Sequence, residues 1–146
     1  MKKTLFLIIF PVVFYTSGNA QTVAQDWTKT DCSGNPHSLF ADYLNNYKVV
    51  LMEFGMACST CGLAGQYFQQ LRDQYAISNP GEFYYFYMDY WAPNDCAPEI
   101  STFLTTYSLT PDVTIDHCLP EMTYYMSGSP MPGYVIVAGP YYAVYM

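Results

Sequence analysis

The stretch VVLMEFGMACSTCGL, residues 49–63, determines how the rest of the chain is expected to fold. Its first residues are apolar and partly β-branched, which predicts a buried strand ending at Gly55. Cys58 and Cys61 follow at the start of a helical pattern, where residues three apart share one face. The unpaired N–H groups and partial positive charge of a helix N-terminus favour a Cys58 thiolate, the attacking species in disulfide exchange. The stretch therefore predicts a strand, a dithiol centre and a helix, in that order.

The helix that follows is expected to run from Ser59 to about residue 75. Apolar residues recur every fourth position along it, at Leu63, Tyr67, Leu71 and Tyr75. Residues at this spacing lie on one face, so we expect these four side chains to form the buried face of the helix.

The other elements are predicted from turn formers and periodicity. We expect a hairpin tip over residues 31–36, a short helix capped by Ser38, a strand over 83–88, a helix over 98–107, and strands over 113–115, 134–137 and 141–145. Strands and helices in the order β-α-β-α-β-β are typical of a layered α/β domain.

The first twenty residues have the composition of a signal peptide. Lys2 and Lys3 precede an apolar run over residues 5–15, and Gly18 and Ala20 supply small residues for cleavage after Ala20. The run is too short for a typical membrane span, although an uncleaved anchor is the alternative. We therefore expect an exported protein, periplasmic or extracellular, with residues 21–146 as its single domain.

The charge of the chain argues against two classes of partner. Its 146 residues include 12 acidic and 5 basic side chains, for a net charge of −7. Cleavage would remove Lys2 and Lys3 and leave a net charge near −9. Such a chain is not expected to bind nucleic acid or anionic membrane surfaces.

Five cysteines in an exported chain indicate a compartment where disulfides persist. Besides Cys58 and Cys61 there are Cys32, Cys96 and Cys118, among which three pairings are possible. Cys96 and Cys118 bracket the second predicted helix, and we expect them to be bonded, leaving Cys32 free or in an intermolecular bond. Such a bridge contributes roughly 3 kcal/mol by constraining the unfolded chain.

Several motifs, in this order, resemble those of one family. They are DCSGN (31–35) followed by Ser38-Leu39, KVVL (48–51) followed by Phe54, the dithiol segment, YSLTP (107–111) with Asp116, and Met131-Pro132 before YVIV (134–137). With these motifs the chain, from about Asp26 to Tyr145, resembles thioredoxin-fold proteins, and among them the exported TlpA/ResA-like thiol–disulfide oxidoreductases. The resemblance implies an α/β three-layer fold: a mixed sheet flanked by helices, with an N-terminal hairpin extension.

The chain also departs from this family. Ala57 stands where family members usually carry tryptophan, and Ser59-Thr60 lack the proline often found before the second cysteine. The chain ends at Met146 inside a predicted strand, without the helix that the family places there. We expect either a different closure of that sheet face or a longer protein.

The candidate site residues follow from the dithiol and from the resemblance. Cys58 is the predicted nucleophile and Cys61 the resolving thiol. Glu53 is an acid within an apolar strand, where burial would raise its pKa and suit it to move a proton for Cys61; the alternative is a solvent-facing side chain. The resemblance places Pro132 at the family's cis-proline and Met131 beside it, where both would contact substrate.

These observations give one leading hypothesis and two alternatives. The leading one is a thiol–disulfide oxidoreductase without a cofactor, acting on protein thiols and disulfides together with an upstream redox donor or acceptor. The first alternative is a Cu(I) chaperone, since Cu(I) favours the soft sulfur of Cys58, Cys61 and a nearby methionine. The second is a non-catalytic binding domain with a structural disulfide. His117 beside Cys118 suggests no zinc site, because four suitably spaced ligands cannot be assembled.

Overall fold

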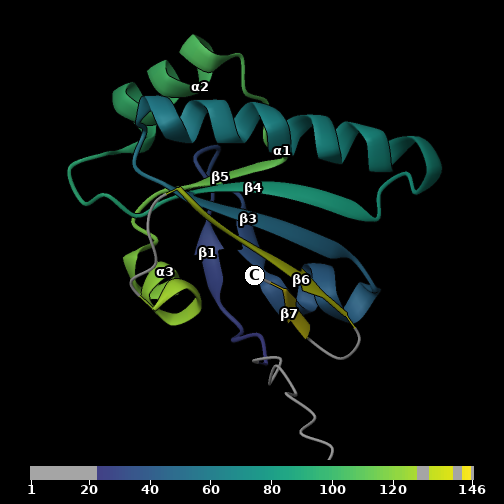
Figure 1. Ribbon diagram of the computed structural model, residues 1–146. Coiled ribbons are helices and arrows are strands. Elements are labelled where there is room, and N and C mark those ends of the chain that lie inside the picture. Colours follow the sequence, from purple (N-terminus) through teal and green to yellow (C-terminus); the bar gives the residue numbers. More distant parts are fainter. Residues whose placement is uncertain (1–22, 128–131, 140–142, 146) are drawn as a thin grey trace, which may run out of the picture.

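The central sheet is built around β3 (Val49–Gly55), the predicted strand before the dithiol. A computed structural model describes residues 23–127, 132–139 and 143–145 of the chain (Figure 1). The sheet has five strands in the order β5-β4-β3-β6-β7. Its other strands are β4 (Phe83–Asp89), β5 (Val113–Ile115), β6 (Gly133–Ala138) and β7 (Ala143–Tyr145). β3, β4 and β5 are parallel to one another, β6 is antiparallel to β3, and β7 is antiparallel to β6, so the sheet is mixed as predicted.

Helices cover both faces of this sheet. They are η1 (Leu39–Tyr43), η2 (Leu44–Asn46), α1 (Ser59–Ser78), η3 (Cys96–Ile100), α2 (Ser101–Tyr107) and α3 (Leu119–Met126). Figure 1 shows α1 and α2 on one face and α3 on the other. The predicted three-layer α/β fold is therefore confirmed.

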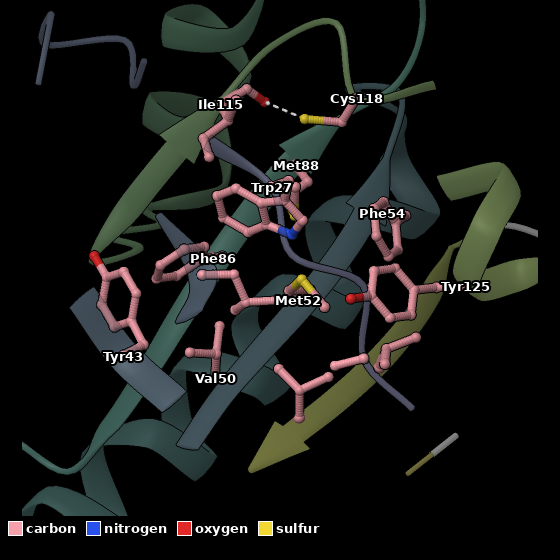
Figure 2. Packing of buried hydrophobic residues seen from close by; sticks show 14 of the residues in the cluster. Trp27, Tyr43, Val50, Met52, Phe54, Phe86, Met88, Ile115, Cys118 and Tyr125 are labelled. Carbon is pink, nitrogen blue, oxygen red and sulfur yellow. Dashed lines mark hydrogen bonds between the residues drawn. The ribbon is translucent and has the colours of Figure 1, made fainter. Parts of the chain in front are cut away.

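The face away from α1 carries the larger core. Val50, Met52 and Phe54 of β3 point into it, because alternate residues of a strand face opposite sides of the sheet. Figure 2 shows these side chains around Trp27 and Phe86, with the rings of Trp27 and Phe86 centred 6.1 Å apart. The alternate residues of β3, among them Glu53, lie under α1 instead. Both sets are buried, as a strand covered on both faces requires.

The predicted N-terminal hairpin is formed by β1 (Thr28–Thr30) and β2 (Pro36–Ser38). Asp31 stabilises its tip, because one carboxylate oxygen accepts from the backbone N–H groups of Ser33 at 2.9 Å and Asn35 at 2.8 Å. Ser38 caps η1 as predicted, its hydroxyl accepting from the N–H of Ala41 at 3.2 Å.

Helix α1 is present where it was predicted, but of its predicted apolar face only Leu71 packs against the core, where it is half-buried. Leu63 and Tyr67 are 65% and 67% exposed, and Tyr75 is 49% exposed. The buried residues are Cys61, Gly62, Gly65 and Phe68. A Cβ on Gly62 would overlap the ring of Tyr107, so the small residues allow α2 to pack closely on α1. Close approach, rather than side-chain hydrophobicity, decides which face is covered.

Helix α3 was not predicted from the sequence. Its first turn contains Pro120, and its buried residues are Tyr125 and Met126, which pack into the core of Figure 2. Proline at the first helical turn is well tolerated, and it was a usable signal for a helix start here.

Two observations concern the ends of the chain, and one concerns membrane spans. The predicted signal peptide, residues 1–20, lies outside the described residues. Among the helices that are described, none is long and apolar enough to cross a membrane. The last described element is β7.

Candidate active site

The candidate site lies where β3 ends and α1 begins. Met56 and Ala57 connect the two elements, and Ala57 has a φ of 53°, in the left-handed region that costs energy for a residue with a Cβ. The Ala57 N–H donates to the Tyr87 hydroxyl at 2.8 Å. This partly buried contact holds the unfavourable backbone conformation that turns the chain into α1.

Cys58 and Cys61 are joined in a disulfide, with their Cα atoms 5.1 Å apart. Cys58 is the N-cap of α1, and its Sγ accepts from the N–H of Cys61 at 3.3 Å. Ser59 and Thr60 lie exposed in the first turn. An N–H donor and the positive end of a helix both stabilise a thiolate at Cys58.

The two cysteines differ in accessibility. Cys58 is half-buried, whereas Cys61 is completely buried in a cluster with Tyr87, Phe103 and Leu109. A partner in solution can therefore reach Cys58 but not Cys61. This is the asymmetry that distinguishes an attacking from a resolving thiol.

Glu53 is fully buried on the α1 side of the sheet. Its Oε2 accepts from the Tyr85 hydroxyl at 2.5 Å, while its Oε1 has no hydrogen-bond partner in the described part of the chain. Burial raises the pKa of the carboxyl from its ordinary value of 4.5 to about 7, although the Tyr85 hydrogen bond opposes the rise. A Cβ on Gly65 would lie 3.1 Å from Oε2, so α1 passes directly over the carboxylate. The solvent-facing alternative is thus wrong, and the proton-transfer role stays a prediction.

A second buried acid, Asp89, lies beneath the loop of Met56 and Ala57, and the sequence did not lead us to predict it as a site residue. Its Oδ2 accepts from the Tyr87 hydroxyl and from Asn94 Nδ2, both at 3.1 Å, and its Oδ1 accepts from the N–H of Trp91 at 2.9 Å. Burial raises the pKa of this carboxyl too. The available signal was an alternation of Tyr85, Tyr87 and Asp89, which places all three on one face of β4. Tyr87 thus connects a buried carboxylate to the backbone next to Cys58.

Pro132 lies near the dithiol loop, as the pairing of the strand that follows it shows. The next residue, Gly133, pairs with Phe54, and β6 is antiparallel to β3. Pro132 is therefore beside the end of β3 from which Cys58 emerges. Met131, and with it the peptide bond before Pro132, lies outside the described residues.

The predicted Cys96–Cys118 bond is wrong, because Cys96 is bonded to Cys32 with a Cα–Cα distance of 5.3 Å. The Cys32 N–H donates to the carbonyl of Thr114 in β5 at 2.8 Å, which brings the hairpin tip to the sheet edge near Cys96. Cys118 is instead free and buried in the larger core, where its thiol donates to the carbonyl of Ile115 (Figure 2). Burial raises the pKa of this thiol, which disfavours its reactive thiolate.

A group of possible metal ligands lies elsewhere, on the loops after β4 and β5. Ligand atoms of Asp95, Asp116 and His117 lie within 4.8 Å of one another. The His117 ring is 3.2 Å from Asp95, and both side chains are more than half exposed. The arrangement is accounted for by a surface ion pair, and Cys118 does not take part in it.

Comparison with known proteins identifies the fold. No protein-family model matches the chain, and no curated protein matches it. The thioredoxin domain of a thiol–disulfide oxidoreductase from Bacteroides vulgatus is similar in structure, with a TM-score of 0.62, 19% identity, and coverage of 85% of this chain and 84% of that one. A thiol–disulfide oxidoreductase from Bacteroides fragilis has a TM-score of 0.66, 13% identity and coverage of 86% and 88%. A putative thiol:disulfide interchange protein DsbE from Chlorobium tepidum has a TM-score of 0.62, 13% identity and coverage of 86% and 82%. The chain has the thioredoxin fold.

Proposed function

We propose that this thioredoxin-fold chain is an exported thiol–disulfide oxidoreductase that exchanges disulfides with protein partners through Cys58 and Cys61. The observation that carries the proposal is the asymmetric pair at the start of α1: a half-buried N-cap cysteine and a fully buried second cysteine. Export is supported by the composition of residues 1–20. The solved structures with the same fold include several thiol–disulfide oxidoreductases, which is consistent with the proposal.

The reduced protein would act in two displacement steps. The Cys58 thiolate attacks one sulfur of the partner disulfide, a bond forms between them, and the partner's other sulfur leaves as a thiolate. The Cys61 thiolate then attacks Cys58 Sγ, forming the Cys58–Cys61 disulfide and releasing the partner's remaining sulfur. The partner gains two electrons and the protein loses them. With an oxidised protein and a reduced partner the same steps run in reverse.

The second step requires that Cys61 lose its proton inside the protein. Glu53 supports this step, because its carboxyl lies under α1, has a pKa near 7 and has an oxygen free to accept a proton. Cys61 and Gly65 are four residues apart on one helical face, and Gly65 passes directly over the carboxylate. We assign Glu53 the role of proton acceptor for Cys61.

The substrate chain would lie against the segment before β6. Pro132 is beside the end of β3 and half-buried, so it can form part of the wall next to Cys58. We assign Pro132 and its neighbour Met131 to substrate contact on that side.

The test is to trap the mixed disulfide. Cys61→Ser should accumulate partner proteins bound through Cys58, because the resolving step is blocked, whereas Cys58→Ser should accumulate few. Cys118→Ser is the matched control and should trap no more than the wild type, because Cys118 is buried. Equal trapping by both active-site variants, or none by either, would contradict the assigned roles.

Copper binding is separated from exchange in the same preparation. With copper chelated, the reduced wild-type protein should still reduce insulin disulfides. Loss of all activity under chelation, together with tight Cu(I) binding by Cys58 and Cys61, would favour the chaperone alternative.

A further inference from the structure

A groove of about 510 Å³ opens beside the dithiol, on the side of α2. Met56 and Ala57 of the active-site loop form one wall, and Pro98, Thr102 and Phe103 of η3 and α2 form part of the other. Pro132 does not line it. The groove is therefore distinct from the described part of the substrate wall assigned above, which is Pro132.

The groove is in contact with the same apolar cluster as the cysteines. Phe103 packs with Cys61 and Tyr87, and Ala57 and Cys58 pack against that cluster from outside. A ligand in the groove would thus contact Ala57, the residue immediately before the attacking Cys58. The small side chain of Ala57 contributes to this opening, because a bulky residue in its place would project from the same wall.

The chemistry of the lining restricts what can bind. Most of it is apolar or hydroxyl-bearing, and the carboxylate of Glu99 is the charged group among the described lining residues. Asp95, four residues before Glu99, does not line the groove, and its carboxylate is paired with the His117 ring at 3.2 Å. The chain is strongly acidic as a whole, with a net charge of −7. An apolar side chain would be buried against Phe103, and a basic neighbour would meet the Glu99 carboxylate.

We infer that this groove receives a partner segment whose reactive cysteine is flanked by a bulky apolar side chain and a basic residue. The inference rests on the proposed function, because it names the class of protein on which Cys58 acts. It assigns substrate selection to α2 and the loop before it, in addition to the segment before β6.

The experiment measures single-turnover oxidation of the reduced protein by dimeric peptide disulfides, copper being chelated. The peptides are capped Gly-Phe-Cys-Arg-Gly and Gly-Cys-Phe-Arg-Gly, a Phe-to-Gly counterpart of each, and a version of each with Glu in place of Arg. A Phe peptide should react about tenfold faster than its Gly counterpart, since burying the ring stabilises the complex. Arg should exceed Glu by roughly threefold, the effect of one exposed charge pair.

Two variants of α2 locate the effect. Thr102→Trp places a bulky ring in the groove and should abolish the preference for Phe. Thr105→Trp makes the same change at another exposed position of α2, outside the groove, and should keep both the preference and the wild-type rate. Circular dichroism confirms that each variant is folded.

The outcomes separate the inference from the proposed function. Equal rates for Phe and Gly peptides in the wild type would overturn the inference, and so would a Phe preference that survives in Thr102→Trp. Reaction with a small disulfide, such as hydroxyethyl disulfide, should proceed whatever the groove does. Failure with that reagent and with every peptide would overturn the proposed function itself.

Discussion

Glu53→Gln tests the assignment of Glu53 as the proton acceptor. The structure predicts both the direction and the size of its effect on the free energy of unfolding. Burial raises the pKa of the carboxyl from 4.5 to about 7 in the folded chain, whereas the unfolded chain keeps the ordinary value. Each pH unit of difference corresponds to about 1.4 kcal/mol, so the difference amounts to roughly 3 kcal/mol. Glutamine has nearly the same shape and cannot ionise.

The sign of the effect follows from proton counts. Below pH 4.5 the carboxyl is protonated in both states, and the folded state has its full stability. Between pH 4.5 and about 7 the unfolded state has lost the proton that the folded state retains, so the free energy of unfolding falls as the pH rises. Above about 7 the contribution is fully lost. Relative to Glu53→Gln, the wild type should therefore lose roughly 3 kcal/mol across this window.

The assay is denaturant unfolding of the oxidised protein across this pH range, with the difference between variant and wild type as the readout. Subtraction removes the contribution of Asp89, whose raised pKa is common to both. Glu82→Gln is the matched control, because Glu82 is exposed and should leave the pH dependence unchanged. Glu53→Gln should also slow the release of a partner from the Cys58 mixed disulfide. A flat difference with unchanged release would refute the assignment.

Three further perturbations test the packing around the site. Tyr87→Phe should cost about 2 kcal/mol, because the N–H of Ala57 loses its hydroxyl partner and the buried Asp89 carboxylate loses one of its three hydrogen bonds, and it should shift the pH profile for alkylation of the nucleophilic thiol. Gly62→Ala should destabilise by about 1–3 kcal/mol through overlap with the ring of Tyr107, and a double-mutant cycle with Tyr107→Ala should recover most of the loss. Replacing Cys32 and Cys96 together by serine should cost roughly 4 kcal/mol in thermal or chemical unfolding, since their disulfide closes a 64-residue separation, and an unchanged stability would contradict this reasoning.

The sequence was sufficient for the architecture wherever one local pattern decided the element. Val49–Gly55 was predictable as a buried strand, because apart from Glu53 its residues are apolar on both faces. The hairpin tip was predictable as a turn, because Asp31 and Gly34 are residue types that favour turns. The two cysteines at the start of α1 were predictable for the same reason. All of these depend on neighbours within a few residues.

The features that sequence reasoning missed depend on contacts between distant segments. The exposed stripe of α1 is the more hydrophobic one, yet Gly62 is covered by Tyr107 of α2, and Gly65 by Leu109 and by Tyr85 and Glu53 of the sheet, because only small residues admit these neighbours. Cys32 pairs with Cys96 because the hairpin reaches the edge of β5, a placement that no spacing along the chain reveals. The link from Tyr87 to Ala57 likewise crosses from β4 to the loop after β3.

The two buried acids near the dithiol are suited to different tasks, and their hydrogen bonds show which. Asp89 accepts from Tyr87, Trp91 and Asn94, so hydrogen bonds to both of its oxygens favour the ionised form. Glu53 accepts one hydrogen bond on Oε2, and its Oε1 has no partner among the described residues, so a proton can be added there without breaking any bond. A carboxylate with both oxygens occupied can position a loop, and one with a free oxygen can exchange a proton. On this ground Asp89 holds the Ala57 turn through Tyr87, and Glu53 is the group to which we assign the proton of Cys61.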